Sequence, residues 1–188
     1  MKLLRYGPKG QEKPGLLDEE GRIRDLSDKI NDIAGAFLAS DQLTQITKLE
    51  TDSLPLVEGI TRLGPPVAGV GKIIAVGINY AAHGEEAKID IPEQPILFSK
   101  AVTSLSGPNE PVVLPKDSVK GDWEVELAVI IGRKAQYVEQ ADALDVIAGY
   151  SIINDVSERE FQLERCGQWV KGKSFDTFAP LGPWLVTP

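Results

Sequence analysis

A β-strand is predicted for Asp122-Trp123-Glu124-Val125-Glu126-Leu127-Ala128-Val129-Ile130-Ile131-Gly132, because apolar and β-branched residues dominate this stretch and a Gly-Arg-Lys break ends it. Successive strand side chains point to opposite faces, so Glu124 and Glu126 point the same way. Their Cβ atoms then lie about 6–7 Å apart on a strand otherwise suited to burial, where the two carboxylates repel each other and are costly to desolvate. A hard cation bound between them would remove both penalties.

A third carboxylate, Asp155, lies where the predicted strand 148–153 stops and a helix is about to begin, a position where side chains face a cleft. Together Glu124, Glu126 and Asp155 offer only oxygen ligands, which suit Mg²⁺, Mn²⁺ or Ca²⁺ better than Zn²⁺. The alternative is that the glutamates lie on a solvated strand face and that Asp155 helps to cap its helix. The spacing alone leaves both interpretations open.

The only histidine of the chain is His83, so any imidazole general base must be this residue. On a helix, Glu86 shares the face of His83 three residues later and can orient the ring. Glu85 points about 100° away and is the second choice. The alternative is an ordinary surface histidine beside acidic residues.

Lys173 lies in a stretch rich in turn formers, which we expect to be a loop. A lysine there can bind a substrate carboxylate or an enolate oxygen, although Lys171 is an equal candidate and most loop lysines are simply solvated. Arg159 and Gln162 lie three residues apart on the helix predicted after Asp155, so both can face the same cleft.

The composition favours a globular protein that acts on small molecules. The chain has 188 residues, of which 42% are hydrophobic, enough to bury a core. The net charge of −8 argues against nucleic acids and anionic membranes as partners. No stretch approaches an apolar run of roughly 18 residues, and residues 1–6 do not resemble a signal peptide. A single cysteine excludes an internal disulfide framework, so we expect a cytoplasmic protein.

The chain divides into two parts in our interpretation, a small amino-terminal domain over residues 1–65 and a catalytic domain over residues 66–188. A Gly- and Pro-rich segment, 61–71, joins them. Strands predominate and the helices are short, so we expect an α+β fold with a mainly antiparallel or mixed sheet. Short helices are expected after Ser27, after Ser40, within 79–87, near 140–146, and from the capping-box pattern that begins at Ser157.

Four motifs then occur in an order that strongly resembles the fumarylacetoacetate hydrolase family, in its bacterial acylpyruvase-like or 2-hydroxyhepta-2,4-diene-1,7-dioate isomerase-like branch. They are Val76-Gly77-Ile78-Asn79-Tyr80-x-x-His83-x-x-Glu86, Trp123-Glu124-Val125-Glu126-Leu127-Ala128, Asn154-Asp155-Val156-Ser157-x-Arg159 and Gly172-Lys173-Ser174-Phe175-Asp176. The resemblance begins near residue 72. It implies a mainly β, mixed β-sandwich roll with short helices, preceded by a small amino-terminal domain.

The resemblance also implies roles for individual residues. Glu124, Glu126 and Asp155 would bind Mg²⁺ or Mn²⁺. His83 and Glu86 would form the catalytic dyad on a lid segment over the substrate. Family members act on keto or diketo acids, and relatives are commonly homodimers.

Three further residues would act on the substrate. Lys173 would hold it and stabilise developing negative charge, with Arg159 and Gln162 close by. The implied activity is metal-dependent hydrolysis of a carbon–carbon bond in an acylpyruvate or diketo acid, in aromatic or sugar-acid catabolism. Oxaloacetate decarboxylation or keto–enol isomerisation on the same metal site is the alternative.

Family members of this type usually continue for about a further third, through strands that bear a Gly-Thr-Pro segment. We therefore expect this chain to be truncated at its carboxyl terminus. A truncated, non-catalytic module is accordingly a third interpretation.

Overall fold

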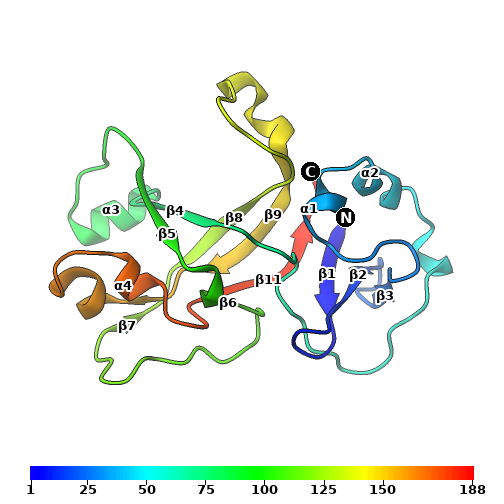
Figure 1. Ribbon diagram of the computed structural model, residues 1–188, viewed down its shortest axis with the longest axis horizontal. Coiled ribbons are helices and arrows are strands. Elements are labelled where there is room, and N and C mark those ends of the chain that lie inside the picture. The colour runs from blue at the N-terminus through cyan, green and yellow to red at the C-terminus, as the bar shows by residue number, and fades with distance from the viewer.

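A seven-stranded sheet forms the centre of the computed structural model, which describes residues 1–188 except for the side chain of Ala87 (Figure 1). Six strands lie in the order β3-β2-β1-β11-β9-β8, all antiparallel, and β6 pairs in parallel with β11. Strands predominate over short helices, which confirms the predicted α+β class. The strand bounds are Lys2–Tyr6 (β1), Lys13–Leu17 (β2), Ile23–Asp25 (β3), Leu105–Ser106 (β6), Val125–Ile131 (β8), Ile147–Asn154 (β9) and Ala179–Val186 (β11).

The two ends of the chain lie side by side in this sheet. β1 pairs with β11 through Lys2 opposite Val186, and the N and C marks are adjacent in Figure 1. Beside β1–β3 lie the short helices α1 (Gly35–Leu38), α2 (Gln42–Ile46) and η1 (Thr51–Ser53). The division at residues 65 and 66 stays a prediction.

The apolar core joins the amino-terminal segment to strands β9 and β11. Leu3 and Leu16 are fully buried against Leu185, as are Leu26 and Ile33 from the connection that follows β3. Burying each such side chain stabilises the fold by roughly 1.5–3 kcal/mol. The first strands are therefore held on the sheet by hydrophobic packing as well as by backbone hydrogen bonds.

The opposite end of the molecule carries a second, two-stranded sheet. β4 (Ile73–Gly77) and β5 (Ile96–Lys100) are antiparallel, and the helix α3 (Ala81–Ala87) lies in their connection (Figure 1). Nearby are η2 (Val102–Ser104), the short pair β7 (Gly121–Asp122) and β10 (Ser157–Glu158), η4 (Glu160–Glu164) and α4 (Val170–Lys173), while η3 (Gln140–Val146) precedes β9. Among the described residues, no helix has both the length and the hydropathy of a membrane span.

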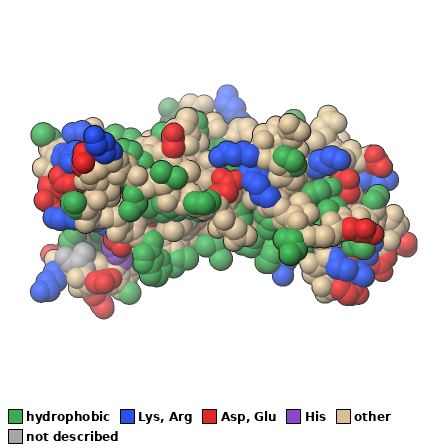
Figure 2. All heavy atoms as spheres, turned by 90° about the horizontal axis from the view of Figure 1, so that it is seen from below, with side chains coloured by type: hydrophobic (Ala, Val, Ile, Leu, Met, Phe, Trp, Pro, Cys, Tyr) green, Lys and Arg blue, Asp and Glu red, His purple; other side chains and the backbone are tan. Residues whose placement is uncertain are grey.

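The strand predicted from Asp122 to Gly132 is divided between two sheets. Asp122 belongs to β7 and pairs with Ser157, whereas β8 begins at Val125. On β8 the side chains alternate, with Glu126 and its face directed inward and the outer face exposed, namely Val125, Leu127, Val129 and Ile131. Apolar side chains are also visible on the surface drawn in Figure 2.

Two predicted helix starts are wrong. No helix begins at Ser27, whose hydroxyl donates instead to Asp25 Oδ1 (2.6 Å) in a tight turn, and the next helix, α1, begins only at Gly35. Ser157 is extended within β10 and donates to the carbonyl of Asp155, because pairing with β7 prevents it from starting a helix. Glu158 takes over the capping role, since its carboxylate accepts the N–H of Phe161 (2.8 Å).

Candidate active site

Three carboxylates from two neighbouring strands meet at the β8 end of the large sheet. Glu124 directly precedes β8, Glu126 lies in it, and Asp155 directly follows β9. The two strands pair with Val125 opposite Asn154, and the N–H of Asp155 donates to the carbonyl of Glu124 (2.8 Å). One oxygen atom of each carboxylate lies within 4.8 Å of the others. We call Glu124, Glu126 and Asp155 the open cluster.

Basic groups contact only two of these carboxylates. Lys173 Nζ donates to Glu124 Oε2 (2.7 Å) and to Asp155 Oδ2 (2.8 Å), and Arg159 also donates to Glu124. Burial raises the pKa of Glu124, but Lys173 and Arg159 outweigh it and leave this pKa below its usual value. No described residue forms a hydrogen bond or an ion pair with the side chain of Glu126. Burial, followed by the charges of Asp155 and Glu124, raises the pKa of Glu126 to about 7.

The donor set fits a divalent cation. Asp122, which accepts from Arg159, is a fourth carboxylate beside the open cluster. The basic groups here are Lys100, Lys173 and Arg159, so the four carboxylates exceed the cations by one negative charge. Glu126 is the carboxylate without a partner, and a shared cation would relieve its repulsion from its two neighbours. Hard oxygen ligands favour Mg²⁺ or Mn²⁺. Glu124, Glu126 and Asp155 are therefore the residues that would hold the ion.

Lys173 lies on a helix, not on the predicted loop. It ends α4, and its N–H donates to the carbonyl of Trp169 (3.1 Å). Its side chain is 2% exposed, because α4 packs closely against η4. At Gly172 an added Cβ would lie 2.6 Å from Cβ of Gln162, so only glycine permits this approach. The Gly-Lys pair thus buries the ammonium group beneath the open cluster.

Arg159 and Gln162 lie beside the cluster, as predicted for a shared cleft. Arg159 Nη1 donates to Gln162 Oε1 (3.1 Å), while its Nε and Nη2 donate to Asp122 (2.9 and 2.7 Å). Gln162 is almost fully buried. These contacts fix the guanidinium plane, and the proposed contact of either residue with substrate stays a prediction.

The helix α3 places His83 over the open cluster. His83 Nε2 lies 4.0 Å from Glu124 Oε1, and Glu86 lines the same cavity. No hydrogen bond joins His83 to Glu86 among the described side chains, so the dyad stays a prediction. Tyr80 precedes α3, and its hydroxyl accepts the N–H of Leu127 (2.9 Å). This bond ties the start of the helix to the outer edge of β8.

A cavity of about 540 Å³ separates α3 from the carboxylates. One wall is aromatic, since Phe98 and Trp169 meet edge to face with their ring centroids 5.4 Å apart. Trp169 also covers Gly77 of β4, where an added Cβ would lie 2.8 Å from the indole ring. The cavity thus combines an acidic floor with an apolar wall, the mixture of a few polar groups and apolar side chains that is typical of small-molecule sites.

The sequence interpretation did not single out Lys100, the last residue of β5. Its side chain is 1% exposed and donates to Asp155 Oδ1 (2.6 Å). The signal was present, because strand alternation places Lys100 on the same face as Ile96 and Phe98. A lysine on an apolar strand face indicates a buried partner.

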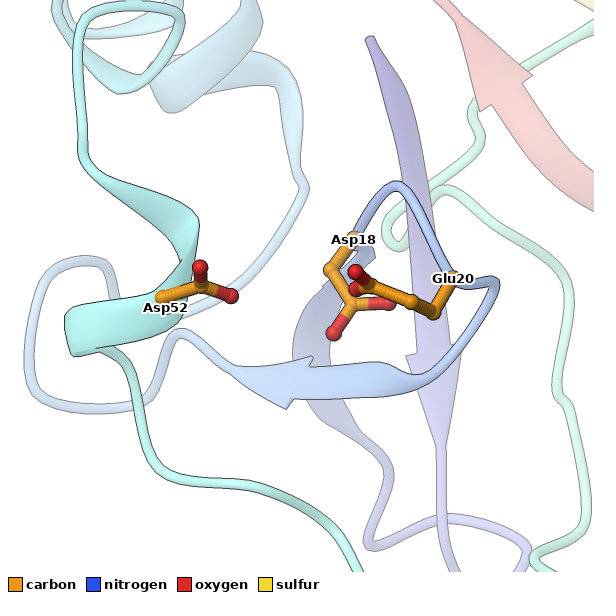
Figure 3. Close-up of side chains that lie close together, drawn as sticks. All are labelled: Asp18, Glu20 and Asp52. Carbon is orange, nitrogen blue, oxygen red and sulfur yellow. The ribbon is translucent and has the colours of Figure 1, made fainter.

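Asp18, Glu20 and Asp52 form a second acidic cluster (Figure 3). It lies beside β2 and β3, at the opposite end of the molecule from β4 and β5 (Figure 1). Asp18 accepts hydrogen bonds from Arg22 Nε and Arg24 Nε, both 2.8 Å long. Burial alone would raise its pKa, but hydrogen bonds from the Arg22 N–H and from the two guanidinium groups lower it to about 2.

The other two carboxylates also have arginine partners. Glu20 accepts from Arg22 (2.7 Å) and Asp52 from Arg24 (3.2 Å). We call Asp18, Glu20 and Asp52 the arginine-bound cluster. Each of its carboxylates thus has an arginine partner, and it gives no reason to expect an ion.

Comparisons with known proteins identify the family of the segment that carries the open cluster. The family model described as fumarylacetoacetate (FAA) hydrolase C-terminal matches residues 72–188, which contain all the candidate site residues. The chain belongs to the fumarylacetoacetate hydrolase family. A relative from Burkholderia orbicola, provisionally named a hydrolase, is 56% identical over 187 residues, which is 100% of this chain and 66% of the relative.

Solved structures of family members share the fold. A fumarylacetoacetate hydrolase from Exiguobacterium antarcticum has a TM-score of 0.80 at 33% identity over 100% of this chain and 66% of its own. A probable 2-hydroxyhepta-2,4-diene-1,7-dioate isomerase from Mycobacterium abscessus has a TM-score of 0.79 at 33% identity, with 100% and 64% covered. A maleylpyruvate hydrolase from Sphingobium, solved with manganese(II) and pyruvate, has a TM-score of 0.79 at 29% identity, with 100% and 67% covered.

These matches confirm the predicted family and fold. The chain spans about two thirds, 66%, of the length of the curated relatives it matches. The matched relatives are named as hydrolases and isomerases, which supports an enzyme of this superfamily. The manganese-bound family member and the open cluster together support a metal site.

Proposed function

We propose that this protein is a divalent-metal-dependent hydrolase that cleaves a carbon–carbon bond in an acylpyruvate or diketo acid. The observation that carries the proposal is the open cluster, in which Glu126 has no basic partner and faces a cavity shared with His83. Manganese(II) and pyruvate in the related maleylpyruvate hydrolase support both the metal and a product of this class.

A bound Mg²⁺ or Mn²⁺ would act as a Lewis acid that holds the keto acid end of the substrate and stabilises negative charge on its oxygen. Lys173 adds a second positive charge on the same side, because its ammonium lies between Glu124 and Asp155. Charge developing on a pyruvate oxygen is thereby stabilised by groups already in place. Arg159 and Gln162 orient the substrate from the side of η4.

His83 supplies the base in this mechanism. It takes a proton from water, whose oxygen attacks the acyl carbonyl carbon. The bond between that carbon and the methylene group breaks, and its electron pair remains on the pyruvate fragment as an enolate. His83 then returns the proton to the methylene carbon, so that acylpyruvate and water give a carboxylic acid and pyruvate. Glu86 orients the imidazole.

The site is equally suited to chemistry without water attack. The related isomerase from Mycobacterium supports a second candidate, keto–enol isomerisation on the same metal site. Oxaloacetate decarboxylation through the same enolate is its variant. The products distinguish these reactions. Hydrolysis gives a carboxylic acid and pyruvate, decarboxylation gives pyruvate and CO₂, and isomerisation gives neither. The remaining expectations, a small-molecule keto acid as partner, a homodimer and a cytoplasmic location, are part of this proposal.

The test is pyruvate release from acetylpyruvate with Mn²⁺, after EDTA, and after Mn²⁺ is restored. We expect turnover with Mn²⁺, its loss with EDTA and its recovery. Full turnover after chelation would contradict the metal role. Oxaloacetate as the only turned-over substrate would favour the decarboxylase, and failure to bind Mn²⁺ or to turn over any keto acid would indicate a non-catalytic module.

The dyad has a matched control within α3. Glu86 lines the cavity, whereas its neighbour Glu85 does not. Glu86→Gln is expected to lower kcat by about 10²-fold or more, the usual scale for general acid–base assistance. Glu85→Gln should leave kcat within about twofold. Equal effects of the two substitutions would exclude a specific role for Glu86.

A further inference from the structure

Lys100 is buried at the junction of the two sheets with all of its hydrogen-bonding capacity used. Its Nζ donates to Asp155 Oδ1 (2.6 Å), to the carbonyl of Val156 (3.1 Å) and to the carbonyl of Lys173. An ammonium group has three N–H donors and no acceptor, so these bonds saturate it. With its side chain 1% exposed, Lys100 has no donor left for a substrate.

The three acceptors belong to two separate segments that build the candidate active site. Asp155 and Val156 follow β9, and Lys173 ends α4. Lys100 itself ends β5, whose partner β4 leads into the helix that carries His83. Beside it, the N–H of Ala101 donates to Ser174 Oγ (2.9 Å), which strengthens the connection between β5 and α4. One side chain thus connects the acidic floor, the substrate lysine and the sheet that supports the histidine.

The bond to Asp155 also sets the rotation of that carboxylate. Oδ1 is bound to Lys100, so Oδ2 points to Lys173 Nζ (2.8 Å) on the side of the open cluster. A buried lysine is costly to desolvate, and an apolar residue of similar volume would often stabilise a fold equally well. The arrangement is better explained by the geometry it imposes than by the stability it adds.

We propose that Lys100 is a positioning residue for the metal centre, holding Asp155 in its ligating orientation and Lys173 at a fixed distance from it. This role rests on the proposed function, because it concerns the same metal. Partners that orient a metal ligand typically change metal affinity by about 10- to 100-fold when they are removed.

The test measures Mn²⁺ binding by titration calorimetry on the wild type, on Lys100→Met and on Lys116→Met, an exposed lysine that serves as the control. Circular dichroism verifies that each protein is folded. We expect the dissociation constant of Lys100→Met to rise about 10- to 100-fold and that of Lys116→Met to stay unchanged. A wild type that does not bind Mn²⁺ would refute the proposed metal site. A wild type that binds, with a folded Lys100→Met that binds equally well, would refute the role of Lys100.

Two further variants separate positioning from simple packing. Lys100→Arg keeps the charge but cannot place one nitrogen among three acceptors, so it should weaken Mn²⁺ binding while remaining folded. It also carries the test if Lys100→Met does not fold, and unchanged affinity in Lys100→Arg would then overturn the role. In an Asp155→Asn background, Lys100→Met should add less than about twofold, because coupled residues are not additive. An equal loss in both backgrounds would show that Lys100 does not act through Asp155.

Discussion

The arginine-bound cluster and the open cluster both contain three carboxylates, but their charges are treated differently by the fold. In the arginine-bound cluster each carboxylate accepts a hydrogen bond from Arg22 or Arg24. In the open cluster, Glu124 and Asp155 accept hydrogen bonds from Lys100, Lys173 and Arg159, and Glu126 has no basic partner. The pKa of Asp18 is about 2 and that of Glu126 about 7.

The comparison teaches that proximity of acidic residues does not by itself make a metal site. What matters is whether the fold leaves a carboxylate without a basic partner in a place that an ion can reach. An arginine fork satisfies carboxylate oxygens in a fixed geometry and occupies the space that an ion would need. The open cluster has one carboxylate without a basic partner, Glu126, and a cavity beside it.

The largest expected effect on Mn²⁺ affinity follows from removing the carboxylate of Glu126. Glu126→Gln should weaken Mn²⁺ binding by at least about 100-fold. Loss of a residue that only orients a ligand costs up to about 100-fold in metal affinity, and here a direct ligand is lost. Metal titration by calorimetry measures this. Glu20→Gln in the arginine-bound cluster is the matched control and should leave Mn²⁺ binding unchanged. Equal losses for both variants would remove the distinction between the clusters.

The second prediction concerns pH. Because the pKa of Glu126 is about 7, the carboxyl group is protonated in much of the metal-free protein below pH 7, and Mn²⁺ must displace that proton. Mn²⁺ affinity should therefore fall by about tenfold per pH unit below pH 7 and level off above it. Titrations of Mn²⁺ over a pH range of about 5.5 to 8.5 would measure this slope. A flat profile would contradict the raised pKa.

The stability of the metal-free protein depends on the same pKa, but it falls as pH rises, whereas Mn²⁺ affinity increases. A raised folded-state pKa means that the folded protein binds the proton more tightly than the unfolded chain does. The contribution of Glu126 is then fully present below its usual pKa of 4.5 and is lost as pH rises to about 7. Urea unfolding of Glu126→Gln should lack this part of the pH slope.

The third prediction concerns the arginine-bound cluster. Asp18→Asn should lower the melting temperature by several degrees, because two arginines lose a buried shared partner. Mn²⁺ affinity should not change. The sign with pH is also fixed, since the pKa of Asp18 is lowered from 3.8 to about 2. Its stabilisation is present above pH 3.8 and is lost as pH falls toward 2. Calorimetric melting checks both statements.

The smallest effect is expected at Asp52, whose side chain is 84% exposed. Asp52→Asn removes a solvent-screened ion pair with Arg24, so the free energy of unfolding should change by no more than about 0.5 kcal/mol. Urea unfolding at low and high salt measures the change. A larger loss would mean that the arginine-bound cluster acts as a cooperative unit.

Strand alternation predicted much of the floor of the active site. It placed Glu124 and Glu126 on one side, and it located Asp155 directly after the strand that became β9. The helix with His83 was also recognisable from its local pattern. These features depend on neighbours in the sequence, so single-chain patterns carry them.

Other features required the assembled sheets. No helix begins at Ser157, as its capping pattern predicted, because β10 pairs with β7. Lys173 lies on a helix instead of the predicted loop, because Gly172 allows α4 to pack against η4. The sequence pattern could not show in which acidic trio every carboxylate has a basic partner. That depends on pairings such as Arg24 with Asp52 and Lys100 with Asp155.

The sequence by itself therefore determined the family, the α+β class and the residue types at the site, because spacing and alternation act over a few residues. Only the tertiary structure decided that Glu126 stays uncompensated while Asp18 does not, and that Lys100 connects the two sheets beneath Asp155. Charge compensation acts over distances of a few ångströms in space, between groups such as Lys100 and Asp155 that are 55 positions apart in the chain.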